Sequence, residues 1–386
     1  VGVVGGGVAG VAAARRLAEA GVPVVIHERE PQLGGRLGAL DFGSEWVSAG
    51  CSYIKAKDAA FVQQLEAWEE QGALTQWAAH PHTVTAPGEW APLPVPDDER
   101  WYAGKPHMGS PLELSAEERE TIRVVRGDVY DANFNGPLWV LAAANAAADE
   151  EEGECFDADM LESHIHSALV VATPGERRTP GSACGNAPTS VRRGSAAVHE
   201  AEIFLGGKTL DAALGRERRK DFTKARVAAV FAFEESLELP FNFAVVTNGS
   251  PITVAICDSS RRTGAADATG DAVAEEVWVV QTATDFAAQA LDEERTREKL
   301  ADELLAAFAE VLGRGTLPAV RRQDALVWVY GDRDYELEGG CVWLEEMKLA
   351  MAGDWAYTGR VEGAWLSGRA AAQRVIDARA KAGATG

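Results

Sequence analysis

The sequence predicts an α/β protein built from two domains, one with parallel strands and helices and one with a largely antiparallel sheet. Strand, glycine-rich turn, helix and second strand follow one another within residues 1–28. An apolar run at 168–172 is typical of a parallel strand that is buried on both faces. Strand-like segments joined by turns between residues 225 and 281 indicate a mainly antiparallel second sheet.

The first segment fits a dinucleotide-binding turn of the Rossmann type. Residues 1–4 form a β-branched strand, after which Gly5, Gly7 and Gly10 fill the G-x-G-x-x-G pattern. Gly5 permits the tight turn, Gly7 the close approach of a pyrophosphate, and Gly10 the packing of the helix on its strand. Glu28 ends the next strand, where its carboxylate can accept hydrogen bonds from ribose hydroxyls. The order of these elements supports nucleotide binding more strongly than the glycines alone.

Composition excludes several classes of protein. With 386 residues, of which 46% are apolar, the chain is long enough for two cores. A net charge of −22 argues against nucleic acid and anionic membranes as partners. The five cysteines are widely spaced, and His164 and His166 have no suitably spaced partner, so we predict reduced thiols and no metal site.

No apolar run is long enough to span a bilayer, which predicts a soluble protein without a transmembrane segment. The chain begins inside a strand and lacks an initiating methionine. We therefore expect a cytoplasmic protein, or alternatively one of an organelle lumen or stroma, such as a plastid, after loss of a transit peptide.

Two further motifs carry a resemblance to a known family. Gly34-Gly35-Arg36 follows the acid and resembles the FAD-binding N-terminus of the flavin amine oxidase superfamily. Gly353-Asp354 and the segment 359–368, Gly-Arg-Val-Glu-Gly-Ala-Trp-Leu-Ser-Gly, are similar to the closing motif of its renalase-like members. The segment 41–46 is similar too, although Glu45 and Trp46 stand where the family has Gln and Tyr or Phe.

The resemblance implies FAD, bound non-covalently, as the cofactor. Asp354 would hold a ribityl hydroxyl, and the N–H groups of Val361 and Glu362 at a helix N-terminus would stabilise negative charge on the flavin. Val129 would contact the adenine through its main chain. The full set of expected cofactor contacts is Gly5, Gly7, Val8, Ala9, Gly10, Glu28, Arg29, Gly35, Arg36, Gly43, Val129, Ala172, Thr173, Gly353, Asp354, Arg360, Val361, Glu362 and Ala364.

The resemblance also implies the domain organisation. Residues 1–50, 120–175 and 320–386 would form a discontinuous FAD-binding domain, and residues 51–119 and 176–319 an α+β substrate or lid domain of the amine oxidase or renalase type. Residues 175–220 are rich in Gly, Ser, Thr, Pro and Arg and read as an insertion. Amphipathic helices are expected at 58–72 and 291–312.

The implied activity is transfer of hydride from a carbon adjacent to nitrogen to flavin N5, with oxygen as the expected electron acceptor. The substrate would be a small molecule, either an amine or a reduced nicotinamide-type heterocycle. No catalytic dyad is visible, and Trp46, Trp101 and Trp355 are candidates for the aromatic walls of the site. A non-catalytic flavoprotein that serves as a subunit of a larger assembly, and an FAD-dependent desaturase or reductase, remain as alternatives.

Overall fold

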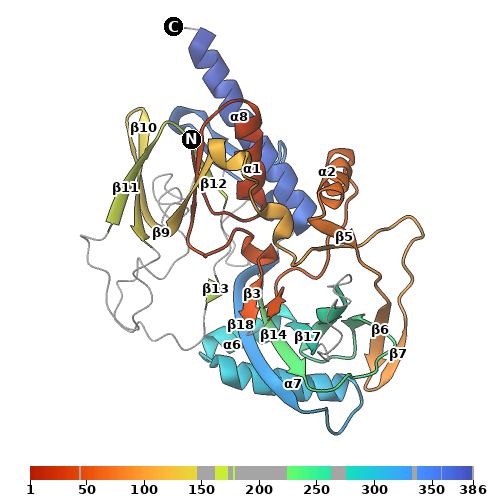
Figure 1. The fold of residues 1–386 in the computed structure, drawn as a ribbon. Helices are drawn as coiled ribbons and strands as arrows, with labels where there is room; N and C mark the ends of the chain where they lie inside the picture. Colours follow the sequence, from red (N-terminus) through yellow and green to blue (C-terminus); the bar gives the residue numbers. More distant parts are fainter. Residues whose placement is uncertain are drawn as a thin grey trace.

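The computed structural model describes residues 1–42, 45–145, 161–172, 177–178, 224–261, 275–332, 337–357 and 359–384. These residues form two eight-stranded sheets, each with its own helices (Figure 1). Most of the expected insertion at 175–220, with Gly43 and Thr173, lies outside the described residues. No described helix is both long and apolar enough to cross a bilayer.

The first sheet contains the dinucleotide-binding segment. Its five central strands, from β9 to β20, pair in parallel, so their carboxyl ends share one edge. The strands β9 (Ile122–Asn135) and β10 (Leu138–Asn145) form an antiparallel hairpin at one side of this sheet. The strand order is β11 (Leu161–His166), β10 (Leu138–Asn145), β9 (Ile122–Asn135), β2 (Val24–Glu28), β1 (Gly2–Val4), β12 (Leu169–Val171), β20 (Leu349–Met351) and β19 (Val342–Leu344).

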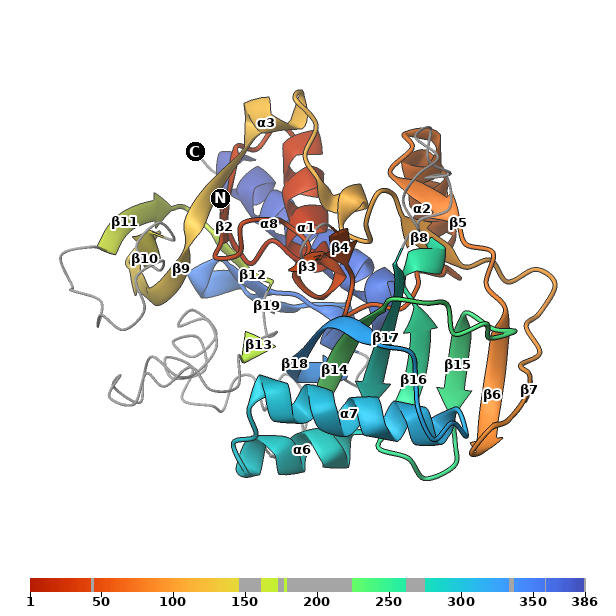
Figure 2. The ribbon, with the colours of Figure 1, turned by 60° about the horizontal axis from the view of Figure 1, so that its bottom comes forward.

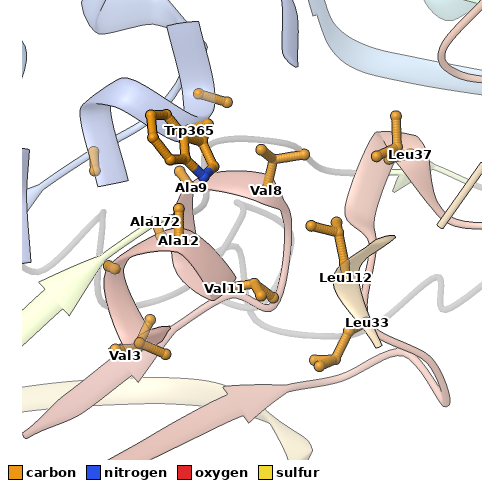
Figure 3. Packing of buried hydrophobic residues seen from close by; sticks show 14 of the residues in the cluster. Val3, Val8, Ala9, Val11, Ala12, Leu33, Leu37, Leu112, Ala172 and Trp365 are labelled. Atoms are coloured by element: carbon orange, nitrogen blue, oxygen red, sulfur yellow. The ribbon is translucent and has the colours of Figure 1, made fainter. Parts of the chain in front are cut away.

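Helices α1 (Val8–Glu19) and α8 (Arg360–Ala384) pack against each other on this sheet. The two helices lie so close together that a Cβ added at Gly368 would lie 2.1 Å from the carbonyl oxygen of Ala9. Trp365 of α8 covers Ala9 and Ala12 of α1 (Figure 3). The far end of α8 projects away from the rest of the molecule (Figure 1).

The expected helix at 58–72 is α2 (Ala59–Glu70), and Asp58 caps it by accepting hydrogen bonds from the N–H groups of Ala60 and Phe61. Its apolar stripe packs into the same core as α1, rather than into a separate lid. The short helix α3 (Glu118–Thr121) leads into β9. A small sheet of β5 (Leu74–Gln76) and β8 (Tyr102–Gly104) follows α2.

The second sheet is largely antiparallel, as the sequence predicted, with only β6 and β15 paired in parallel. Its strand order is β13 (Arg177–Arg178), β18 (Val320–Asp332), β14 (Lys224–Phe233), β17 (Glu276–Thr282), β16 (Ile252–Cys257), β15 (Phe243–Val246), β6 (Pro81–Ala86) and β7 (Glu89–Pro92). Because β18 belongs to this sheet, the expected boundary at residue 320 is wrong, and the C-terminal return to the first sheet begins with β19.

The two faces of the second sheet have different partners. Along β14, Val227, Ala229 and Phe231 pack in one core with α6 (Thr284–Asp292) and α7 (Arg297–Val311). The alternate residues Ala228 and Val230 pack against the hairpin of β3 (Leu40–Phe42) and β4 (Glu45–Val47). Figure 2 shows this hairpin between α1 and the second sheet.

The helix expected at 291–312 begins instead at Arg297. Glu294 has a positive φ of 49° and separates α6 from α7. Thr296 then caps α7 by accepting a hydrogen bond from the N–H of Lys299. The apolar periodicity runs across both helices and therefore does not mark this break, whereas the cap residue does.

Candidate cofactor site

The glycine turn lies at the carboxyl edge of the first sheet, between β1 and α1. Gly5 has a φ of +97°, and a Cβ on Gly10 would lie 1.8 Å from the carbonyl oxygen of Gly5. No side chain caps α1 at Gly7, and the nearest atom to a Cβ placed there is Gly35 Cα at 3.9 Å. The first N–H groups of α1, including those of Val8 and Ala9, therefore face an open cradle of backbone.

Glu28 orders this turn. One carboxylate oxygen accepts a hydrogen bond from the N–H of Gly6 at 2.5 Å, and the other accepts from the N–H of Glu30 at 2.9 Å. Burial raises the pKa of Glu28, while the two backbone N–H groups oppose that rise. The carboxylate end of β2 is thus buried beside the glycines, where the spacing predicted it.

The Gly34-Gly35-Arg36 segment lies against the same turn. The N–H of Gly34 donates to the carbonyl of Gly6 at 2.9 Å, and Gly7 and Gly34 form a parallel bridge. Gly34 and Gly35 have φ values of +145° and +55°, which only glycine adopts without strain. This conformation brings Arg36 beside the first sheet.

Arg36 and Asp354 meet at the carboxyl edge, although 318 positions separate them in the sequence. The Arg36 Nη2 donates to Asp354 Oδ1 at 2.6 Å, and the Asp354 side chain is 8% exposed. Asp354 directly follows Gly353, whose N–H donates to Ser367 Oγ at 3.0 Å. A cation and a carboxylate that the sequence predicts as cofactor contacts therefore lie in direct contact.

The N-terminus of α8 closes the site. Gly359 and Arg360 both have positive φ values, 74° and 71°, and the second is strained for a residue with a Cβ. The Glu362 carboxylate accepts hydrogen bonds from the N–H groups of Lys57 and Asp58 at 2.7 and 2.6 Å. Its side chain therefore joins α8 to the start of α2.

The other expected contacts surround this edge. Val129 is buried in the middle of β9, shortly after the part of that strand that pairs with β2. Ala172 is buried directly after β12, and Ala364 is buried on the first turns of α8. The Nε atom of Arg29 lies 3.6 Å from Oε1 of Glu30, and the Arg29 side chain is partly exposed. Gly43 and Thr173 lie outside the described residues.

The three candidate aromatic walls have different environments. Trp46 on β4 is 43% exposed, with its ring centroid 6.0 Å from that of His107. Trp101 is buried, stacks on Tyr53 at 3.9 Å and donates from Nε1 to Glu99. Trp355 is buried in the core beneath the carboxyl edge. Among these three, Trp46 alone presents a large exposed surface.

Sequence reasoning missed a buried charged pair beside the site. Arg261 is 3% exposed, and its Nη1 donates to the carbonyls of Cys51 and Ser52 at 2.9 and 2.7 Å. Its Nη2 donates to the carbonyl of Ser48 at 3.0 Å and to the carboxylate of Asp258. Arg261 ends a short 3₁₀ turn, Ser259–Arg261, and Asp258 directly precedes this turn, so no spacing rule marks the pair. Burial raises the pKa of the adjoining Cys51 thiol to about 11.

Residues 1–184 match a family model described as FAD dependent oxidoreductase. A carotenoid phi-ring synthase from Streptomyces griseus is 70% identical over 37 residues, which are 10% of this chain and only 7% of that protein. A structure from Exiguobacterium sp. 255-15, assigned provisionally as a protoporphyrinogen oxidase, is similar over 98% of both chains, with 11% identity and a TM-score of 0.61. Wild-type putrescine oxidase bound to putrescine is similar over 97% of this chain and 98% of its own, with 11% identity and a TM-score of 0.54.

These similarities concern the overall fold and the N-terminal part of the chain. The fold is similar to that of these two oxidase structures, with a Rossmann-like nucleotide-binding sheet and a second sheet. The matched segment contains the glycine turn, Glu28 and Arg36. The described geometry fits a dinucleotide cofactor such as FAD because the uncapped start of α1 faces a cradle that side chains do not fill.

Proposed function

We propose that the protein is a renalase-like oxidase, which removes hydride from a carbon adjacent to nitrogen in a planar reduced heterocycle, with oxygen as the electron acceptor. FAD would lie with its pyrophosphate at Gly7 and Arg36, its adenosine ribose at Glu28 and its ribityl chain at Asp354. The substrate would lie beside the exposed Trp46. The alternative substrate within the same activity is an amine, which is what the putrescine oxidase structure contains.

The position of Lys348 supports a heterocycle. Many amine oxidases carry a lysine near the flavin, and Lys348 is the lysine of the segment 333–359. Its carbonyl accepts from the N–H of Leu169 and it directly precedes β20, whereas Gly353 and Asp354 follow that strand. Lys348 therefore lies at the edge of the sheet opposite to the site. A substrate whose ring nitrogen already donates electron density requires no such base.

The roles of this chain's own residues follow from the geometry. FAD, when bound, supplies the electron-accepting ring. The N–H groups at the start of α8, at Val361 and Glu362, would stabilise negative charge near that ring. The second sheet presents small apolar residues, Ala228 and Val230, toward the β3–β4 hairpin, and this apolar floor would exclude water from the reacting atoms.

Anaerobic mixing with candidate donors tests the substrate class. We expect 2- or 6-dihydronicotinamide nucleotides to bleach the flavin absorbance, and putrescine, spermidine and benzylamine to leave it unchanged. Readmission of oxygen should restore the colour. Bleaching by an amine with none by the heterocycles would contradict the proposal, and a flavin that neither kind of donor bleaches would favour a non-catalytic flavoprotein.

The short match to a carotenoid phi-ring synthase gives no support to a different chemistry. It covers 37 residues of this chain. A segment of that size can hold the nucleotide-binding turn and little of a substrate site. A desaturase or reductase function therefore has no specific structural observation in its favour.

A further inference from the structure

Residues 48–52 join the β3–β4 hairpin to the rest of the chain, and two side chains of the second sheet hold their backbone. Arg261 binds the carbonyls of Ser48, Cys51 and Ser52. Gln281 of β17 binds the two carbonyls between them, because its Nε2 donates to Ala49 at 2.9 Å and to Gly50 at 2.8 Å. Five consecutive carbonyls are thus bound by two side chains, which we name the Arg261–Gln281 clamp.

The clamp is buried and electrically balanced. Arg261 is 3% exposed and Gln281 is 9% exposed. Asp258, which is 4% exposed, accepts from Arg261 and from the N–H of Ser48 at 3.3 Å. Both terminal nitrogens of the Arg261 guanidinium are bound, whereas its buried Nε has no hydrogen-bond partner among the described residues. Because an unpaired buried charge is costly, the carbonyls that Nη1 and Nη2 bind are held in position.

The clamped segment touches the cofactor site directly. A Cβ placed on Gly50 would lie 2.2 Å from the carbonyl oxygen of Arg36 and 3.2 Å from its Cα. The backbone of Gly50 therefore lies against the backbone of Arg36, with no side chain between them. Arg36 in turn reaches Asp354 at 2.6 Å. A continuous path of contacts runs from the second sheet to the Arg36–Asp354 pair.

We propose that Arg261 and Gln281 are positioning residues for the cofactor, which hold residues 48–52 so that Gly50 sets the backbone of Arg36 and thereby the guanidinium at the FAD site. Neither residue touches the cofactor in this account. The inference rests on the proposed placement of FAD at Arg36 and Asp354. It implies that the second sheet controls cofactor binding as well as the substrate space.

The test compares Arg261→Lys and Gln281→Met with Leu304→Ala in the purified FAD-loaded protein. Lysine keeps the charge but cannot bind three carbonyls in a plane, and methionine keeps the volume of glutamine without its donors. Leu304 is fully buried in the core of α7 and the second sheet, so its truncation destabilises that sheet without breaking the clamp. The measurements are the FAD dissociation constant, the visible circular dichroism of the bound flavin and the melting temperature.

We expect the FAD dissociation constant to rise about tenfold in both clamp variants. The visible circular dichroism of the bound flavin should also change in both. Leu304→Ala should lower the melting temperature at least as much and leave the dissociation constant within about twofold of wild type. Unchanged FAD binding in Gln281→Met, which preserves packing, would overturn the inference even if Arg261→Lys fails to fold. Equal weakening by Leu304→Ala would also overturn it. A wild-type protein that binds no FAD would instead contradict the cofactor placement itself.

Discussion

Replacing Glu28 or Asp354 by alanine is expected to weaken FAD binding by about tenfold to a hundredfold in each variant. Each variant would lose the charge-assisted hydrogen bond between its carboxylate and a nucleotide hydroxyl. Such a bond is worth about 1.5–3 kcal/mol. Glu28→Ala also removes the acceptor for the N–H groups of Gly6 and Glu30, and Asp354→Ala removes one partner of Arg36. The dissociation constant follows from quenching of flavin fluorescence during titration.

The matched control for both variants is Asp377→Ala on α8, whose carboxylate accepts only a surface hydrogen bond from Gln373 among the contacts described for it. This variant should bind FAD as the wild type does. Glu28→Gln keeps one acceptor oxygen and should bind FAD with an intermediate affinity. Retention of wild-type affinity in both Glu28→Ala and Asp354→Ala would mean that the nucleotide lies elsewhere.

Acidification is expected to destabilise the folded chain steeply below about pH 6.5, because His27 and His166 are buried without charge. They are 2% and 6% exposed, and their Nε2 atoms lie 2.9 Å apart, in hydrogen-bond contact. Burial lowers the pKa of His27 to about 3 and that of His166 to about 4. His164 lowers both pKa values further, and Arg123 lowers that of His27.

The sign of the effect follows from these directions. An unfolded histidine titrates near pH 6.5, so between pH 6.5 and 4 the unfolded chain binds protons that the folded chain does not. The stabilisation is complete above pH 6.5 and is lost progressively as the pH falls toward 4 and then 3. The double variant His27→Leu, His166→Leu removes both groups, and its free energy of unfolding should depend less on pH in this range.

Urea unfolding at a series of pH values measures this dependence. The wild type should lose on the order of a few kcal/mol between pH 6.5 and 4, relative to the double variant. His80→Leu, which removes an exposed imidazole, should keep the wild-type slope. Parallel pH profiles of the wild type and the double variant would show that the buried pair does not control acid stability.

The parts of the fold that sequence predicted best are those in which local chemistry determines the conformation. Gly5 forms the turn with a positive φ, and Asp58 caps α2, as their residue types suggest. Glu28 ends β2 beside the glycines, while its contact with a ribose stays a prediction. The alternation along β14 also identifies two buried faces of a sheet. These features depend on neighbours within a few residues or on strand periodicity, both of which the sequence displays.

The parts that sequence did not predict depend on partners far away in the chain. The sequence of β18 is compatible with either sheet, and only its pairing with β14 shows that the strand belongs to the second sheet. Arg261 stands in a polar turn, and its carbonyl partners lie more than 200 positions earlier. Glu362 likewise binds N–H groups 305 and 304 positions away. Composition and spacing contain no information about such contacts.

Acid precipitation of the purified protein is the most direct test that this chain binds FAD non-covalently at the carboxyl edge of its first sheet. The cofactor segment from Gly353 to Gly368 contains no cysteine or histidine to attach a flavin. We therefore expect one FAD per chain in the acid supernatant, identified by chromatography and mass, and a colourless pellet. Absence of flavin from the folded protein, or a yellow colour that stays with the pellet, would contradict the account.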